Sequence, residues 1–276
     1  MPCGRGERDA EGHYLRPVFP GNSIAHKLDP RTKILLVTLY IIALFSAKGW
    51  MGYAVMAVTL AACVKVSHVG LRALVRGLKP LVFIIAFTGI LNMFFTPDTH
   101  YLWEWGILRV SVKGIENALF MVIRIMLLVM GTFLMTYTTS PIRLTDGLES
   151  LLNPLKKIHV PVHELAMMMA IALRFIPTLI EETDKIMSAQ KARGADFDSG
   201  NIFQKAKALV PILVPLFISA FRRADELATA MECRCYHGGE GRTKLHVLKY
   251  QRRDYVALAG GVVILVLVVA LRRLGT

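Results

Sequence analysis

Two arginines flanked by small residues are the residues in this sequence best suited to recognition chemistry. Arg193 lies in "KARGADF" (191–197) and Arg234 lies in "MECRCYHGG" (231–239). The small residues beside them are Ala192, Gly194, Cys233 and Cys235. A cation at a helix C-terminus gains about 0.3–1 kcal/mol from the helix dipole, which explains an arginine but not its small neighbours. Small neighbours leave the guanidinium open to a partner's groove, where it can bond to a carboxylate or to backbone carbonyls.

The second of these stretches also has residue types that bind metals, because Cys233, Cys235 and His237 alternate. Alternation places side chains on one face only in a strand, whereas this region is typical of a helix end. No second Cys/His cluster stands nearby to complete four ligands. His159 and His163 are four residues apart, but a proline lies between them, so they need not share a helical face. We therefore expect no metal site in this chain.

The motifs of nucleotide binding and hydrolysis are missing from the sequence. There is no G-x-x-x-x-G-K-[ST], and the Gly-rich run "HGGEGRT" (237–243) lacks the lysine and the spacing of a phosphate loop. There is also no G-x-S-x-G and no H-E-x-x-H. The Asp-Gly at 146–147 is found in lipid-headgroup transferases, but further acidic residues are not at helical spacing around it. We expect no catalytic residue and no cofactor site in this chain.

The composition indicates a membrane protein. The chain has 276 residues, 54% of them hydrophobic, and its mean hydropathy is +0.47. Its formal net charge of +13 could suit nucleic acid, but the apolar runs favour the membrane surface. Basic and aromatic residues do not alternate as in single-strand binders, so we expect no nucleic-acid partner. The polar N-terminal segment 1–27 has no apolar signal region and is expected to be a cytoplasmic tail.

Five apolar runs predict an all-α polytopic membrane protein. The runs cover about 28–47, 50–66, 80–96, 116–137 and 255–271. Some are short against the roughly 20 residues that a spanning helix needs. The alternative, buried helices of a soluble protein, would require a core too large for this chain to surround. We predict four spans within 28–138, a cytoplasmic domain over 139–250 and a last span within 251–276.

Loop charges predict the orientation. The loop 65–79 has four basic residues and no acidic one, so it should be cytoplasmic. The segment 141–254 holds 13 of the 20 acidic and 17 of the 33 basic residues and should be largely solvated. The N-terminus and this segment are then cytoplasmic. Five spans leave Arg272 and Arg273 outside, against the positive-inside tendency.

Capping residues and apolar spacing predict the helices of the cytoplasmic domain. Asp29 and Ser140 are each followed by proline, which is typical of an N-cap. Asp29 would cap the first span, and Ser140 would cap the first cytoplasmic helix. Three amphipathic helices are expected, over about 141–157, 161–193 and 203–236. The second has apolar residues three, four or seven apart at Leu165, Met169, Ala172, Ile176, Leu179 and Ile186. The methionines at 167–169 suit either an adaptable binding surface or ordinary core filling.

One charged residue falls inside a predicted span. Arg124 lies within the run 116–137, where an unpaired arginine is costly. It should therefore face protein or a carboxylate. We prefer a structural pair with another span to a substrate site.

These motifs together resemble a known family. The chain resembles the transmembrane T component of energy-coupling factor (ECF) transporters, relatives of the cobalt-importer permease CbiQ, over nearly all of its length beyond about residue 22. The resemblance is carried by "SIAHKLDPRTK", "TTSPIRLTDGLESLLNPL", "ELAMMMAIALRFIPTLIEE", "AQKARG" and "AMECRCYHGGEGRT". In that family two Ala-Arg-Gly-like motifs end the long coupling helices and dock in grooves of two ATP-binding-cassette ATPases. Ala192, Arg193 and Gly194 match the first motif. Cys233, Arg234 and Cys235 hold the position of the second but depart from Ala-Arg-Gly.

The resemblance implies a non-catalytic coupling subunit of an ATP-driven importer. Two ATPase subunits would bind ATP and Mg, and a separate membrane-embedded S component would bind a vitamin or a transition-metal ion. Two other readings stay open. An ordinary importer permease would have its own substrate pathway and need no S component. A polytopic membrane enzyme would need a polar constellation at the membrane boundary, and the sequence provides none that is convincing.

Overall fold

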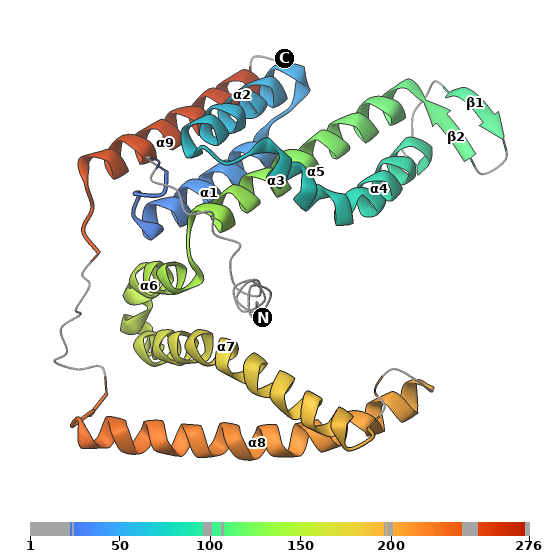
Figure 1. Cartoon of the computed structure of the whole chain (residues 1–276). Coiled ribbons are helices and arrows are strands. Elements are labelled where there is room, and N and C mark those ends of the chain that lie inside the picture. The colour runs from blue at the N-terminus through green and yellow to red at the C-terminus, as the bar shows by residue number, and fades with distance from the viewer. Residues whose placement is uncertain are drawn as a thin grey trace, which may run out of the picture. The chain divides into compact units, whose positions relative to one another are not determined.

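The computed structural model describes residues 23, 25–95, 101–105, 108–195, 197, 201–238 and 248–273. This described part is almost entirely helical (Figure 1), which confirms the all-α prediction. The predicted tail 1–27 and the Gly-rich run 237–243 lie mostly outside the described residues.

The apolar first half of the chain and its last run form one set of helices. They are α1 (Pro30–Ser46), α2 (Gly49–Ser67), α3 (Leu71–Leu78), the short 3-10 helix η1 (Lys79–Leu81), α4 (Val82–Phe95), α5 (Val112–Thr138) and α9 (Arg252–Arg273). The charged segment between them forms α6 (Pro141–Leu152), the 3-10 helix η2 (Asn153–Ile158), α7 (Val162–Ala192) and α8 (Ile202–Cys233).

Within the described residues, five helical stretches are long and apolar enough to cross a membrane, so the chain is a polytopic membrane protein. They are α2, the stretch Leu71–Phe94, α5, α7 and α9. The number agrees with the prediction, but the membership differs in two helices. At 17 residues, α1 is about 26 Å long, short of the roughly 30 Å of hydrocarbon in a bilayer. In contrast, α7 qualifies by length and composition although its second half is charged.

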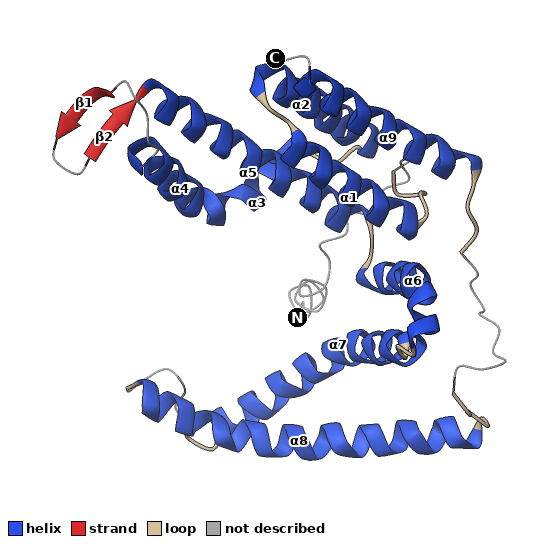
Figure 2. Cartoon of the chain, turned by 180° about the vertical axis from the view of Figure 1, so that it is seen from behind, coloured by secondary structure: helices blue, strands red, loops and turns tan. Residues whose placement is uncertain are grey.

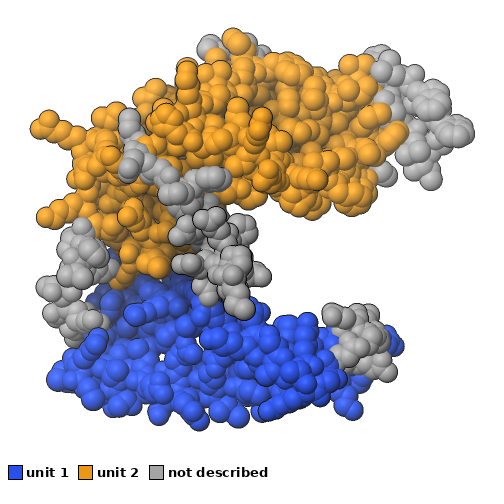
Figure 3. Space-filling view, in the orientation of Figure 1, with its two compact units in different colours: residues 1–16, 152–247 blue, residues 17–151, 248–276 orange. Residues whose placement is uncertain are grey.

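The chain divides into two compact units (Figure 3). Unit 2 comprises residues 17–151 and 248–276, and unit 1 comprises residues 1–16 and 152–247. The helix α6 belongs almost wholly to unit 2, because Gly147 packs against Pro30 so closely that a Cβ there would lie 2.9 Å from the proline ring. The domain boundaries at 138 and 250 stay predictions.

The core of unit 2 is formed where α1, α2, α5 and α9 meet. Its fully buried residues include Leu44 of α1, Met56 of α2 and Val268 of α9. The hydroxyl of Tyr40 crosses from α1 to α5 and donates a hydrogen bond to the carbonyl of Leu127 at 3.0 Å. Through these contacts α1 packs with the membrane-spanning helices of unit 2, although it is shorter than a full span.

Helix starts and ends follow the predicted caps. The carboxylate of Asp29 accepts a hydrogen bond from the N–H of Arg31 at 2.9 Å, and α1 begins at Pro30. The helix α6 begins at Pro141, as predicted. The predicted continuation of α6 to residue 157 is not α-helical. The 3-10 helix η2 follows instead, because Pro154 has no N–H to donate to an α-helical hydrogen bond.

A short antiparallel hairpin was not predicted. The strands β1 (Tyr101–Trp105) and β2 (Leu108–Ser111) lie in the connection between α4 and α5 (Figure 2). Aromatic and β-branched residues in this connection favour strand pairing. This signal in the connection was local, but the prediction from apolar runs alone did not use it.

Candidate functional site

The helix α7 ends in a Schellman motif at the first candidate arginine. The N–H of Ala195 donates to the carbonyl of Gln190 and the N–H of Gly194 donates to that of Lys191, both at 3.0 Å. This pair of bonds is the signature of the motif, with Arg193 as the C-cap. Gly194 has φ +89°, in the left-handed region that favours glycine. Glycine is therefore favoured at 194 by the backbone as well as suited to close approach.

The helix α8 ends in the same motif at the second arginine. The N–H of Tyr236 donates to the carbonyl of Met231 at 3.1 Å, and the N–H of Cys235 donates to that of Glu232 at 2.8 Å. Arg234 thus holds the position that Arg193 holds in α7. Cys235 takes the place of Gly194 and has φ +55°. A residue with a side chain costs roughly 1–2 kcal/mol in this left-handed region, so the second motif contains a strained backbone at Cys235.

Both arginines present their side chains to solvent within unit 1. Arg193 and Arg234 are exposed, and so are the four small residues beside them. Neither guanidinium makes a hydrogen bond or an ion pair with any residue that the structure describes. A Cβ at position 194 would meet no atom within 4 Å, which shows how open the surroundings of Arg193 are. The five donors of each guanidinium are available to a partner.

Contacts between α7 and α8 place the two arginines far apart. The carboxylate of Glu182 pairs with the guanidinium of Arg223 at 3.1 Å. The amide of Gln190 donates to the carbonyl of Pro211 at 3.5 Å. These contacts make the two helices run in opposite directions, and in Figure 1 α7 is inclined to α8 and meets it toward the C-terminal end of α7. Arg193 therefore lies near the level of Pro211, and the 23 residues from there to Arg234 span about 35 Å of helix.

That separation excludes one small groove as the receptor of both arginines. Each arginine needs its own groove, either on two molecules or on two ends of a large one. Because the two helix ends have the same backbone geometry, two similar grooves fit them best. Sequence reasoning found both arginines but not their shared backbone motif. The signal available in the sequence was that Gly194 and Cys235 each directly follow their arginine, at the position that becomes left-handed in this motif.

The metal alternative gains nothing from the structure. Among the described residues, no three His, Cys, Asp or Glu side chains come together as a metal-binding group. Cys233 and Cys235 lie on either side of the C-cap, and both are exposed free thiols. That the chain holds no metal stays a prediction.

Unit 1 also carries an apolar face that is exposed along α8. Residues 45% to 84% exposed lie three, four or seven positions apart on one side of the helix. They are Phe203, Val210, Val214, Phe217 and Phe221, with Leu213 and Ile218 beside them. On α7 the predicted stripe is partly exposed, at Leu165, Met169 and Ile176. Sequence reasoning described the stripe of α7 but missed the more exposed one of α8, whose spacing of three and four was visible in the sequence.

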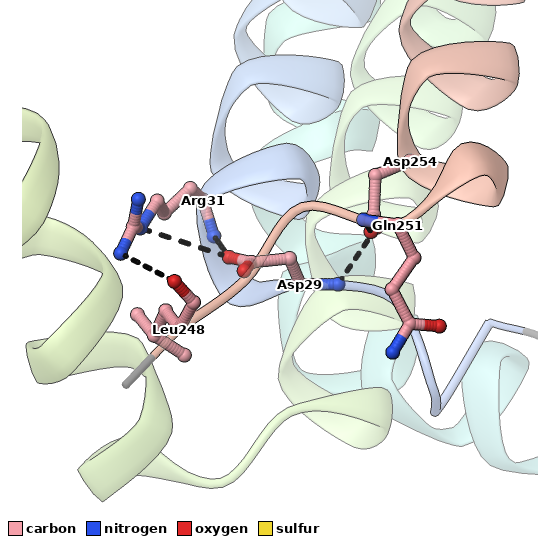
Figure 4. Close-up of polar contacts among 5 residues, drawn as sticks. All are labelled: Asp29, Arg31, Leu248, Gln251 and Asp254. Carbon is pink, nitrogen blue, oxygen red and sulfur yellow. Dashed lines mark hydrogen bonds and ion pairs between the residues drawn. The ribbon is translucent and has the colours of Figure 1, made fainter. Parts of the chain in front are cut away.

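In unit 2 a buried carboxylate joins two helix starts (Figure 4). One oxygen of Asp254 accepts from the N–H of Asp29 at 2.9 Å, and the other accepts from the N–H of Gln251 at 2.7 Å. Asp254 is 1% exposed and lies in the first turn of α9, where it caps that helix from its third position. The N-cap of α1 and the start of α9, 225 residues apart, are therefore held by one side chain.

Two basic side chains of α1 extend this junction. The guanidinium of Arg31 donates to the carbonyl of Leu248 at 3.4 Å and lies 5.3 Å from the ring of Tyr250. The ammonium of Lys33 is buried and donates to the carbonyl of Thr138 at 2.9 Å and to the hydroxyl of Thr139 at 3.0 Å. The charge of Lys33 thus lies at the C-terminus of α5, where a cation is favoured. Both side chains are therefore held by bonds within unit 2.

The intramembrane arginine has the structural partner that was predicted. Arg124 of α5 donates through Nε to the hydroxyl of Tyr53 on α2 at 2.9 Å. Its guanidinium also lies 5.8 Å from the rings of Phe45 and Tyr53. A hydroxyl and two aromatic faces, rather than a carboxylate, satisfy this charge.

Known proteins resemble this chain over most of its length. A family model described as a cobalt transport protein, CbiQ, matches residues 21–245. The chain is 54% identical over 243 residues to the energy-coupling factor transporter transmembrane protein EcfT of Ruminiclostridium cellulolyticum, with 88% of this chain and 89% of that protein covered. It is 56% identical over 246 residues to the protein of that name from Thermosediminibacter oceani, with 89% and 91% covered. The Bacillus subtilis EcfT protein is 47% identical over 253 residues, with 92% and 96% covered.

Proposed function

Since the chain belongs to the CbiQ family, and within it to the transmembrane T components of ECF transporters, we propose that it couples two ATPase subunits to a separate substrate-binding S component. The single observation that carries this proposal is the shared geometry of Arg193 and Arg234. Two exposed guanidinium groups, with no partner among the residues that the structure describes, stand on helix ends of the same backbone motif, separated by about 35 Å of helix. Two copies of one type of ATPase groove, or two similar grooves, would receive them.

Docking by these arginines would use their planar fork. A guanidinium can bond a carboxylate with two N–H groups and still donate to backbone carbonyls at the rim of a groove. The small side chains beside each arginine allow the walls of the groove to approach the helix end. The proposed ATPase-docking residues are Ala192, Arg193, Gly194, Cys233, Arg234 and Cys235.

ATP and Mg are assigned to the partner subunits. The sequence has no phosphate-binding loop, so the chain itself would be non-catalytic and would hold no cofactor. When the ATPases bind and hydrolyse ATP, their movement would pull on the ends of α7 and α8. A helix transmits such a displacement along its length because its backbone bonds make it stiff.

The exposed apolar face of α8, with the partly exposed stripe of α7, is assigned to the S component. Contiguous exposed apolar residues, such as those along α8, mark interaction surfaces. An apolar face tolerates sliding better than a set of directional hydrogen bonds, which suits a partner that reorients. The cargo, a vitamin or a transition-metal ion, would be chosen by the S component. The assembly would lie in the prokaryotic cell membrane, with the N-terminus and unit 1 in the cytoplasm.

Reconstitution tests this proposal against its main alternative, an ordinary importer permease with its own pathway. Vesicles would contain the chain with both ATPases, with and without a candidate S component, and uptake of labelled cargo would be measured with ATP present. We expect uptake only when the S component is included. Uptake of the same cargo by the chain and ATPases alone would refute the coupling role and support the ordinary permease.

A further inference from the structure

The helix α3 forms the N-terminal end of the stretch Leu71–Phe94, outside the part that fills the hydrocarbon of a bilayer. The helix α4 has 14 residues and is about 21 Å long, and the three residues of η1 add about 6 Å. Together they nearly fill the roughly 30 Å of hydrocarbon. The stretch Leu71–Phe94 qualifies as a span only as a whole, with α3 as its polar end. The eight residues of α3 therefore fall in the headgroup layer.

One face of α3 is fixed against protein. Leu74 is fully buried and Leu78 is 7% exposed. On the same side, a Cβ at Gly77 would lie 2.6 Å from the ring of Phe133 on α5, so the absence of a side chain lets the two helices touch. This packing fixes how α3 is rotated about its axis, and hence which residues can face the bilayer.

The next face of α3 is apolar and exposed. At 100° per residue, Leu71 and Val75 follow Leu74 and Leu78 around the helix. Leu71 is 64% exposed and Val75 is 56% exposed. The exposed apolar surface continues into α4 at Val82 and Phe83. Such a surface is suited to the upper part of the acyl chains.

The third face of α3 is basic and has no acidic counterpart. Arg72, Arg76 and Lys79 follow the apolar face around the helix, and all three are exposed. None of the three makes an ion pair with a residue that the structure describes. The sequence has no Asp or Glu between Asp29 and Asp98. A buried face, an apolar face and a basic face in this order are the arrangement of a helix that lies in the membrane interface.

We propose that α3 is an interfacial helix that binds anionic phospholipid headgroups through Arg72, Arg76 and Lys79, with Leu71 and Val75 inserted among the acyl chains. The occupant is a lipid rather than a free anion, because the apolar face lies directly beside the basic one. Each basic residue near an anionic surface contributes roughly fivefold in affinity. This inference does not depend on the proposed function.

The test uses the full chain purified in detergent and a short-chain phosphatidylglycerol as the probe. The variant R72Q/R76Q/K79Q removes three charges from α3. The matched control K156Q/K157Q/R222Q removes three charges from exposed positions of η2 and α8. Lipid affinity is measured by native mass spectrometry, and folding is checked by thermal unfolding. We expect the α3 variant to bind phosphatidylglycerol at least tenfold more weakly and the control to stay within twofold of the wild type.

Two further measurements separate the alternatives. The variant L71S/V75S keeps every charge and should weaken binding of phosphatidylglycerol severalfold while leaving its low affinity for inorganic phosphate unchanged. Phosphatidylcholine should bind the wild type and the α3 variant equally weakly. Equal losses in the α3 variant and its control would overturn the proposal, since net charge alone would then explain binding. Competition by inorganic phosphate at the same concentration as lipid, or displacement of the lipid by a candidate S component, would also overturn it.

Discussion

Arg193 and Arg234 occupy the same C-cap position of two Schellman motifs, one at the end of α7 and one at the end of α8. The backbone bonds of the two motifs match one for one. This equivalence holds although the residue after each arginine differs, being Gly194 in the first and Cys235 in the second. The helix ends are therefore similar in shape and differ in the side chain that follows the arginine.

The left-handed residues of the two motifs should respond oppositely to substitution. Gly194→Ala introduces a side chain at φ +89° and should weaken the end of α7 by about 1 kcal/mol. Cys235→Gly removes a side chain from φ +55° and should strengthen the end of α8 by a similar amount. Hydrogen exchange of the Ala195 amide should then accelerate, and that of the Tyr236 amide should slow, each about fivefold. Slower exchange in both variants would contradict the left-handed geometry.

The buried carboxylate of Asp254 should be needed for the stability of unit 2. Asp254→Ala leaves the buried N–H of Asp29 and the part-buried N–H of Gln251 without their acceptor. An orphaned buried donor costs about 1–3 kcal/mol, so the variant should lose at least that much. Thermal unfolding in detergent measures the effect, with Asp225→Ala, at an exposed position of α8, as the control. Equal melting of the two variants would show that the junction does not stabilise the unit.

Tyr53 and Arg124 should show coupled effects. Tyr53→Phe removes the acceptor of the Arg124 Nε inside an apolar bundle and should cost about 1–3 kcal/mol. Arg124→Met also removes the charge, so adding Tyr53→Phe to it should cost much less than Tyr53→Phe alone. A double-mutant cycle on unfolding free energies measures this difference. Additive losses would mean that the hydroxyl and the guanidinium do not depend on each other.

Local signals in the sequence were sufficient for much of this fold. Asp29 before Pro30 and Gly194 after Arg193 indicate where helices begin and end, because capping depends only on neighbouring residues. The apolar runs were equally local, and α2, α5 and α9 lie where they predicted. The arginine pair of the candidate site was visible for the same reason.

Features that depend on distant residues were beyond sequence reasoning. Asp254 bonds to Asp29 across 225 residues, and no spacing rule connects them. The buried position of Lys33 depends on where α5 ends, at Thr138. The left-handed conformation of Cys235 is set by the motif that ends α8, which overrides the preference of a residue with a side chain. Such features become visible only when packing is known.

The most direct test of the central claim is the affinity of the chain for the proposed ATPase partners after removal of each arginine. Arg193→Ala, Arg234→Ala and the double variant would be compared with Arg222→Ala, an exposed arginine of α8 outside the caps. The complex would be captured in mild detergent, and ATPase binding would be titrated. We predict that each single variant weakens binding more than tenfold, beyond the roughly fivefold that the loss of 1 kcal/mol of dipole stabilisation allows, and that the double variant abolishes it. A double variant that retains both ATPases as tightly as Arg222→Ala would contradict the account.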